Sequence, residues 1–182
     1  MDLKLMPTAC ALDGALMTGL PAHITAATGM DALTHNMEAY LAKMPHPLCE
    51  GIALQGMMLI HGSLANAVKR PDLESRSNML IASLMGAVAF QKGLGVVHSL
   101  AHPLSSLLDT HHGLANAVNI PYGMEYNIEG FEHKFRQMAR ALSLKVPLRI
   151  RSRRRRWTSI SATAISASRS KRPVSASRSP NS

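Results

Sequence analysis

The sequence is poor in aromatic residues and in strand-like patterns, and both shortages narrow the fold class. Phe, Trp and Tyr make up 4% of the 182 residues. Val, Ile and aromatic residues do not alternate with polar ones, as they do in half-buried strands, and apolar residues recur at spacings of three and four instead. The sequence therefore predicts an all-α helical bundle over residues 21–145, preceded by a lead-in segment over residues 1–20.

Cysteines, a signal sequence and long apolar runs are also scarce or missing. Cys10 and Cys49 are too few for a disulfide framework, which favours a reducing compartment. The N-terminus lacks a basic segment followed by a long apolar run. The most apolar stretch, residues 79–90, is too short to span a bilayer. We therefore expect a cytoplasmic chain with no membrane partner.

Acidic residues are absent from residues 146–182, which hold ten basic residues and ten serines. Residues 1–145 hold ten basic and eleven acidic residues, so the net charge of +9 belongs to the tail. Such a composition cannot bury enough apolar surface to offset the entropy of ordering, and we expect a disordered tail. Two interpretations of it stay open: an arm that binds nucleic acid or other polyanions, and the product of a reading-frame shift.

Helix signals divide residues 21–145 into segments. Thr28 and Asp31 resemble a capping box, which predicts a helix from about residue 29 to residue 43. Pro45 and Pro47 should break it, and Pro103 should kink or end a short turn beside His98. The other helices are expected at about residues 52–68, 72–91, 114–118 and 131–142.

Aspartate and histidine recur at a spacing that suits a metal site. Asp31 and His35 lie four apart and share one face of a helix, while His98 begins a second segment and His112 precedes Gly113. One carboxylate and three imidazoles suit a divalent first-row ion such as Fe²⁺ or Zn²⁺ and leave coordination positions open for water or substrate.

Each of these residues taken alone has a commoner explanation. An aspartate is favoured in the first turn of a helix, where Asp31 is expected, and a single histidine is more often a core or turn residue. His111 is the alternative ligand beside His112. Glu38 lies on the face of Asp31 and is placed to orient His35, with a packing or solvent-facing role as the alternative. The remaining histidines are expected to be structural or exposed: His23, His46, His61 and His133.

Three separated motifs resemble the iron-containing (group III) alcohol dehydrogenases. They are ATGMDALTHNMEAY at residues 27–40, GLGVVHSLAHPL at residues 93–104 and HGLANA at residues 112–117. The ending IPYGMEYN at residues 120–127 fits as well. The resemblance covers roughly residues 5–145 and keeps the family's order of motifs.

The resemblance implies that the four metal ligands are Asp31, His35, His98 and His112. It implies a catalytic and cofactor-binding role for His102, near the metal and the nicotinamide. The fold would be the helical C-terminal domain of a dehydroquinate-synthase-like enzyme, with Fe²⁺ as the ion and Zn²⁺ as the alternative. NAD(P) would be the cofactor, a small alcohol or aldehyde the substrate, and a homodimer a compatible assembly.

The chain departs from that family at both ends. It has no G-x-G-x-x-G turn and no N-terminal α/β domain, and the basic tail stands where the family's last helices belong. Ser105 and Ser106 replace residues that are often glycine. We therefore expect a truncated dehydrogenase that is inactive alone. The alternatives are a basic-tailed nucleic-acid-binding protein and a non-functional gene fragment.

Overall fold

The computed structural model describes residue 4 and residues 7–144, and within them the chain is helical with no strand. The predicted all-α fold is confirmed. The predictions for the basic tail concern residues outside the described part of the chain. The elements are η2 (Gly14–Met17), α1 (Ala22–Leu41), α2 (Pro47–Lys69), α3 (Leu73–Ala89), η3 (Phe90–Lys92), α4 (Val96–Leu108), α5 (His112–Asn127) and α6 (Glu132–Ala141).

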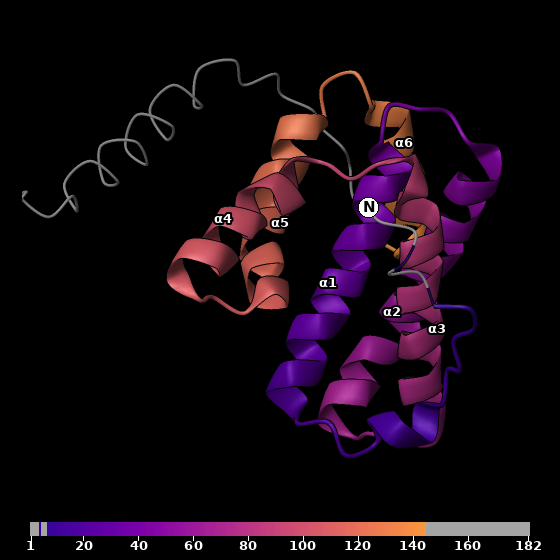
Figure 1. Cartoon of the computed structure of the whole chain (residues 1–182). Coiled ribbons are helices and arrows are strands. Elements are labelled where there is room, and N and C mark those ends of the chain that lie inside the picture. The colour runs from indigo at the N-terminus through magenta and orange to yellow at the C-terminus, as the bar shows by residue number, and fades with distance from the viewer. Residues whose placement is uncertain (1–3, 5–6, 145–182) are drawn as a thin grey trace, which may run out of the picture. The chain divides into compact units, whose positions relative to one another are not determined.

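Helix α1 lies at the centre of the arrangement (Figure 1). On one side α1 contacts α2 and α3, which also pack against each other. On the other side it contacts the pair formed by α4 and α5, and α6 packs on α2. A single helix is therefore shared between two interfaces.

The apolar core lies mainly between α1, α2 and α3. Met57 and Ile60 of α2 and Ala39 of α1 are almost fully buried there, and Met138 of α6 closes one end. Small residues dominate this core, so the helices approach one another closely. The burial of these side chains is the main source of stability in this half of the molecule.

The first helix begins earlier than predicted. It starts at Ala22 after Pro21, so Asp31 lies in its middle rather than in its first turn. The Thr28 hydroxyl donates to the Ile24 carbonyl one turn back, and it therefore caps nothing. The capping box predicted from Thr28 and Asp31 is wrong.

Three prolines lie within helices: Pro47, Pro103 and Pro121. Pro47 begins α2 rather than only breaking α1, because a proline at the first turn of a helix loses no hydrogen bond. Pro103 and Pro121 lie inside α4 and α5, which run on to Leu108 and Asn127. The two helices pack against each other, and this packing outweighs the one backbone hydrogen bond that each proline removes.

Helices α3 and α6 agree with their predicted ranges, whereas α2 begins five residues before the predicted residue 52 and α5 extends well beyond the predicted residues 114–118. Helix α3 starts after Asp72, whose side chain accepts from the Ser75 N–H while Ser75 accepts from the Asp72 N–H. Helix α6 falls within the predicted range. The lead-in segment contains η2, whose buried Gly14 lies against Ser77 of α3.

One helix of the described part, α2, is long and apolar enough to cross a membrane, and a sharply bent pair of segments, residues 73–92 and 96–108, passes the same test together. Buried core helices pass this test too. Helix α2 contacts α1, α3 and α6, and 33% of its most apolar window is buried inside the structure.

Candidate metal centre

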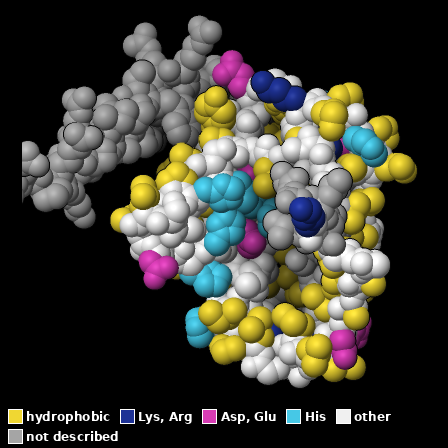
Figure 2. Space-filling model, viewed as in Figure 1, with side chains coloured by type: hydrophobic (Ala, Val, Ile, Leu, Met, Phe, Trp, Pro, Cys, Tyr) yellow, Lys and Arg dark blue, Asp and Glu magenta, His cyan; other side chains and the backbone are white. Residues whose placement is uncertain are grey.

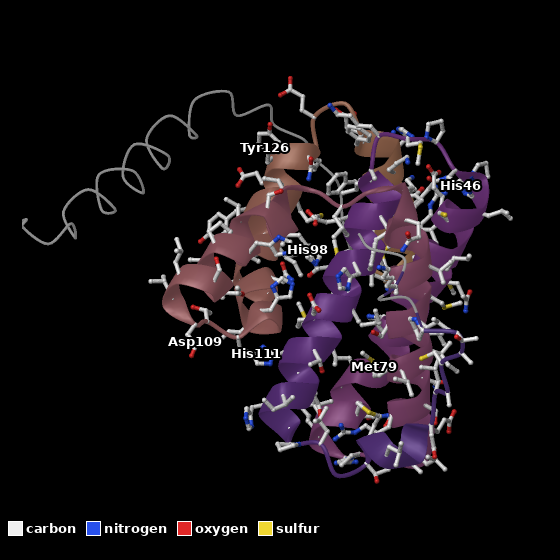
Figure 3. The ribbon with its side chains drawn as sticks, in the orientation of Figure 1. His46, Met79, His98, Asp109, His111 and Tyr126 are labelled. Carbon is white, nitrogen blue, oxygen red and sulfur yellow. The ribbon has the colours of Figure 1, made fainter. Side chains whose placement is uncertain are left out.

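Three helices bring their acidic and histidine residues together where α1 meets α4 and α5. Helix α1 supplies Asp31, α4 supplies His98 from its first turn, and α5 supplies His112 as its first residue. Figure 2 shows histidine side chains gathered beside an acidic one where α1 meets α4 and α5. Figure 3 places His98 between these helices.

The ligating atoms of these three residues converge on one point. One oxygen of Asp31, Oδ1, lies 3.6 Å from Nε2 of His98 and 3.6 Å from Nε2 of His112. One ligand atom from each residue lies within 4.8 Å of the others. These separations suit atoms arranged around a common ion.

The buried ring of His98 supplies an independent sign of an ion. Its Nε2 has no hydrogen-bond partner, and the side chain is 3% exposed. A separation of 3.6 Å from Asp31 is too long for a hydrogen bond. Buried nitrogens without partners are rare, and a metal ion between Asp31 and His98 would satisfy this one. A carboxylate with imidazoles is a donor set that Fe²⁺ and Zn²⁺ accept.

His35, the fourth predicted ligand, flanks this group. Its Nδ1 lies 3.9 Å from Oδ2 of Asp31, and its ring stacks on that of His98 with centroids 4.5 Å apart. The ring also contacts Phe90. The structure therefore brings His35 to the site but outside the three residues whose ligand atoms converge most tightly. Its ligation stays a prediction.

The other two histidines of these motifs lie at the rim. His102, one turn after His98, is exposed, and its ring centroid lies 5.3 Å from that of His112. His111 precedes α5 and is exposed (Figure 3), and it is not among the converging residues. The geometry favours His112 over His111 as a ligand and leaves the role predicted for His102 untested. The four histidines outside these motifs, His23, His46, His61 and His133, are exposed.

Glu38 of α1 contacts the site through His98, not through His35 as predicted. Its Oε2 lies 2.7 Å from Nδ1 of His98, and the carboxylate also accepts backbone N–H groups at the start of α4. The face of α1 that carries Glu38 was predicted correctly, and the partner was wrong. Sequence spacing within α1 carried no information about α4.

Asn116 is a site residue that the sequence analysis missed. Its Nδ2 donates to Oδ1 of Asp31 at 2.6 Å and lies 3.1 Å from Nε2 of His112. Asn116 is fully buried and follows His112 by four residues, on the same face of α5. That spacing was the available signal. Ser105 lies 3.5 Å from the other ring nitrogen of His112.

Gly113 allows α5 to lie against α1. A Cβ atom at this position would lie 2.2 Å from the carbonyl oxygen of Ala27, a backbone atom that cannot rotate away. The glycine after His112 is therefore required by the close approach of two helices. This approach carries His112 to within reach of Asp31.

The electrostatics of the site favour a cation. Burial raises the pKa of Asp31, but the contact with His98 and the nearby His35 outweigh it and lower the pKa below its ordinary value. Burial and the neighbouring charge of His98 lower the pKa of His35 and of His112 despite the attraction of Asp31. At neutral pH these residues therefore present an ionised carboxylate and two neutral rings, the forms that ligate metals.

His98 behaves differently because it lies between two carboxylates. Burial would lower the pKa of His98, but Asp31 and Glu38 outweigh burial and raise the pKa to about 9. A metal ion that binds Nε2 has to displace the proton there. The same negative charges that hold the proton also attract the ion.

Comparison with known proteins identifies the family to which the chain belongs. The model of the Fe-containing alcohol dehydrogenase family, C-terminal, matches residues 25–164. The probable alcohol dehydrogenase EutG of Escherichia coli (strain K12) is 44% identical over 144 residues, covering 78% of this chain and 36% of that protein. The NAD-dependent methanol dehydrogenase of Bacillus methanolicus is 40% identical over 148 residues, covering 80% of this chain and 39% of that protein.

A solved structure confirms the fold. The crystal structure of 1,3-propanediol oxidoreductase superposes with a TM-score of 0.72 at 42% identity, covering 74% of this chain and 36% of that one. The chain thus spans little more than a third of the length of the relatives that it matches. With more than half of its residues matched by the family model, the chain belongs to the Fe-containing alcohol dehydrogenase family, and its described residues form the helical C-terminal domain of that family.

Proposed function

We propose that the chain is the metal-binding part of an NAD(P)-dependent alcohol dehydrogenase that acts on a small alcohol or aldehyde. The observation that carries the proposal is the convergence of Asp31, His98 and His112 around the unpartnered Nε2 of His98. The names of the matched relatives support the substrate class, and one of them is NAD-dependent.

Each residue of the site has a proposed task. Asp31, His98 and His112, with His35 beside them, hold a divalent ion, Fe²⁺ or Zn²⁺. When bound, that ion would supply a Lewis acid for the oxygen of the alcohol or aldehyde. Hydride would pass from the alcohol carbon to the oxidised cofactor, or from the reduced cofactor to the aldehyde carbon. Asn116 holds Asp31 through its amide and keeps the carboxylate directed toward the two rings.

His102 is proposed to carry the proton of the substrate. Its ring is exposed and lies against His112, so it can exchange protons with water at the mouth of the site. The same position would place it against the nicotinamide in a complete enzyme. Residues that bind the pyrophosphate of NAD(P) are not among the motifs of this chain, and we expect no alcohol oxidation by the chain alone.

Metal content tests the first half of the proposal. The purified chain, loaded anaerobically with Fe²⁺ or with Zn²⁺, should hold about one ion, and His98→Ala should abolish stoichiometric binding. Replacement of the exposed His61 by alanine is the matched control and should change nothing. If the variant with Asp31, His35, His98 and His112 all replaced by alanine kept a stoichiometric ion, the assignment of the site would be wrong.

A chimera tests the second half. Residues 25–144 of this chain would replace the matching segment of the Bacillus methanolicus NAD-dependent methanol dehydrogenase, and NADH formation from methanol and longer alcohols would be followed. The proposal predicts turnover that His98→Ala abolishes. A folded chimera that binds both metal and NAD but oxidises no alcohol would contradict it.

A further inference from the structure

Glu38 is a buried carboxylate whose partners all come from another helix. Its side chain is 0% exposed, although it lies on α1 among residues that pack into the molecule. Its carboxylate accepts from the N–H groups of Gly95 at 3.1 Å, Val97 at 2.6 Å and His98 at 3.2 Å. Oε2 also lies 2.7 Å from Nδ1 of His98. Four donors occupy the acceptor sites of one carboxylate.

Helix α4 depends on this carboxylate because it has no cap of its own. Its N-cap residue is Gly95, which carries no side chain, and no side-chain cap is present there. The N–H groups of Val97 and His98 are in buried residues, where unpaired donors are costly. Glu38 therefore acts as the cap of α4 from α1, and its negative charge suits the positive end of the helix.

The same carboxylate sets the state of the His98 ring. With Nδ1 donating to Glu38, the lone pair available for a metal lies on Nε2, the nitrogen that faces Asp31. The backbone hydrogen bonds fix where the Cα of His98 lies, and the ring hydrogen bond fixes how the ring is turned. One side chain thus controls both the position and the orientation of a proposed ligand.

We propose that Glu38 is a positioning residue of the metal centre, which holds the first turn of α4 and the His98 ring so that Nε2 faces Asp31. The inference rests on the proposed metal site and adds to it a residue that touches neither ion nor substrate. It replaces the sequence-based interpretation in which Glu38 orients His35.

Glu38→Gln is the direct test because it keeps the size of the side chain. Glutamine has one acceptor oxygen, and its amide hydrogens would face N–H donors, so it cannot satisfy the four donors. We expect zinc affinity, measured by competition with a chromophoric chelator, to fall about 10- to 100-fold, the range found for outer partners of metal-bound histidines. The same change in another ion pair, Glu50→Gln, is the control and should leave zinc affinity unchanged.

Gly95→Ala provides a second variant that keeps the carboxylate. Its Cβ would lie 2.6 Å from Oε1 of Glu38, so the carboxylate has to move away from the start of α4. Zinc affinity should fall in this variant as well. If Glu38→Gln does not fold, Gly95→Ala decides, and a folded Gly95→Ala variant with wild-type affinity would overturn the proposal.

The wild-type chain offers a test without substitution. In the zinc-loaded protein labelled with ¹⁵N-histidine, nitrogen shifts should show His98 bound through Nε2, with a slowly exchanging proton on Nδ1. Binding through Nδ1, or a missing Nδ1 proton, would refute the role of Glu38. Failure of the wild-type chain to bind zinc would overturn the metal centre and this role together. Wild-type affinity in a folded Glu38→Gln variant would overturn the role alone.

Discussion

The two sides of α1 carry opposite kinds of packing. Toward α2 and α3 its buried residues include Ala32, which clusters with Ala82, and Ala39, which clusters with Met57. One buried polar side chain, Asn36, lies among them and donates to the Ala82 carbonyl. Toward α4 and α5 it presents Asp31, with Glu38 about two turns further on. On the proposed function, one side of this helix supplies stability and the other supplies chemistry.

The polar side is unfavourable without its partners. Buried carboxylates and imidazoles are costly unless hydrogen bonds or an ion satisfy them. Glu38 has four donors, whereas His98 keeps one nitrogen without a hydrogen bond. The apolar side needs no ligand, so we expect it to form in the metal-free chain. Variants on the apolar side and on the polar side of α1 can test these two expectations separately.

The largest effect on stability should come from the apolar side. Met57 is fully buried in α2, and Met57→Ala should lower the free energy of unfolding by about 2–5 kcal/mol, through lost burial and the cavity left behind. Urea unfolding followed by circular dichroism measures the loss. Under folding conditions zinc affinity should stay at the wild-type value. A large loss of affinity in the folded variant would show that the two sides are not separable.

Gly113→Ala should affect both sides, because it acts where α5 touches α1. The added methyl collides with the Ala27 carbonyl, and the helices have to separate. We expect a loss of about 1–3 kcal/mol in unfolding free energy, as for overpacked positions, and weaker zinc binding because His112 moves with α5. Gly62→Ala is the matched control, since its Cβ would meet nothing within 4 Å. Wild-type zinc affinity in Gly113→Ala would argue against His112 as a ligand.

Much of this arrangement could be predicted from the sequence, and the exceptions share a cause. The spacing of Asp31 and His35 placed them on one face, and helical periodicity located α2, α3 and α6. What failed depended on contacts between helices. The partner of Glu38 and the continuation of α4 past Pro103 are decided by packing that no local pattern contains.

Thr28 and Asn116 show two other limits. Thr28 has the residue type of a helix cap but bonds to the carbonyl one turn back, so its type alone was misleading. Asn116 has the right spacing from His112, but amides have many structural uses, so the spacing alone does not mark it as a site residue. The residues proposed for the metal site could be predicted to converge because their motifs occur together, which single residues do not reveal.

The ion pairs of Glu50, which lie away from the candidate metal centre, should make the free energy of unfolding depend on pH. Glu50 Oε1 lies 2.8 Å from the ammonium groups of Lys92 and Lys134. Burial would raise the pKa of Glu50, but the two lysines outweigh it and lower the pKa below the ordinary 4.5. Its contribution to stability is therefore present above pH 4.5 and is lost as the pH falls through the lowered pKa.

Glu50→Gln should lower the unfolding free energy at pH 7 by about 1–3 kcal/mol, because the side chain of Lys92 is left buried without a counter-charge. The difference from wild type should shrink as the pH falls below 4.5. Urea unfolding across pH 3–7 measures it. A difference that is constant over this range would contradict the assigned ion pairs.

The smallest effect is expected at His111. It lies beside His112 in sequence but is exposed and outside the converging group. His111→Ala should leave zinc affinity and unfolding free energy at their wild-type values, whereas His112→Ala should weaken zinc binding. The reverse result would exchange the two residues in the site.

The most direct test of the central claim is anomalous diffraction at the zinc edge from crystals of the zinc-loaded chain. The account predicts one strong peak where α1, α4 and α5 meet, adjacent to Asp31 Oδ1 and to Nε2 of both His98 and His112. A zinc ion bound elsewhere with these three residues free, or no bound zinc at saturating concentration, would contradict it.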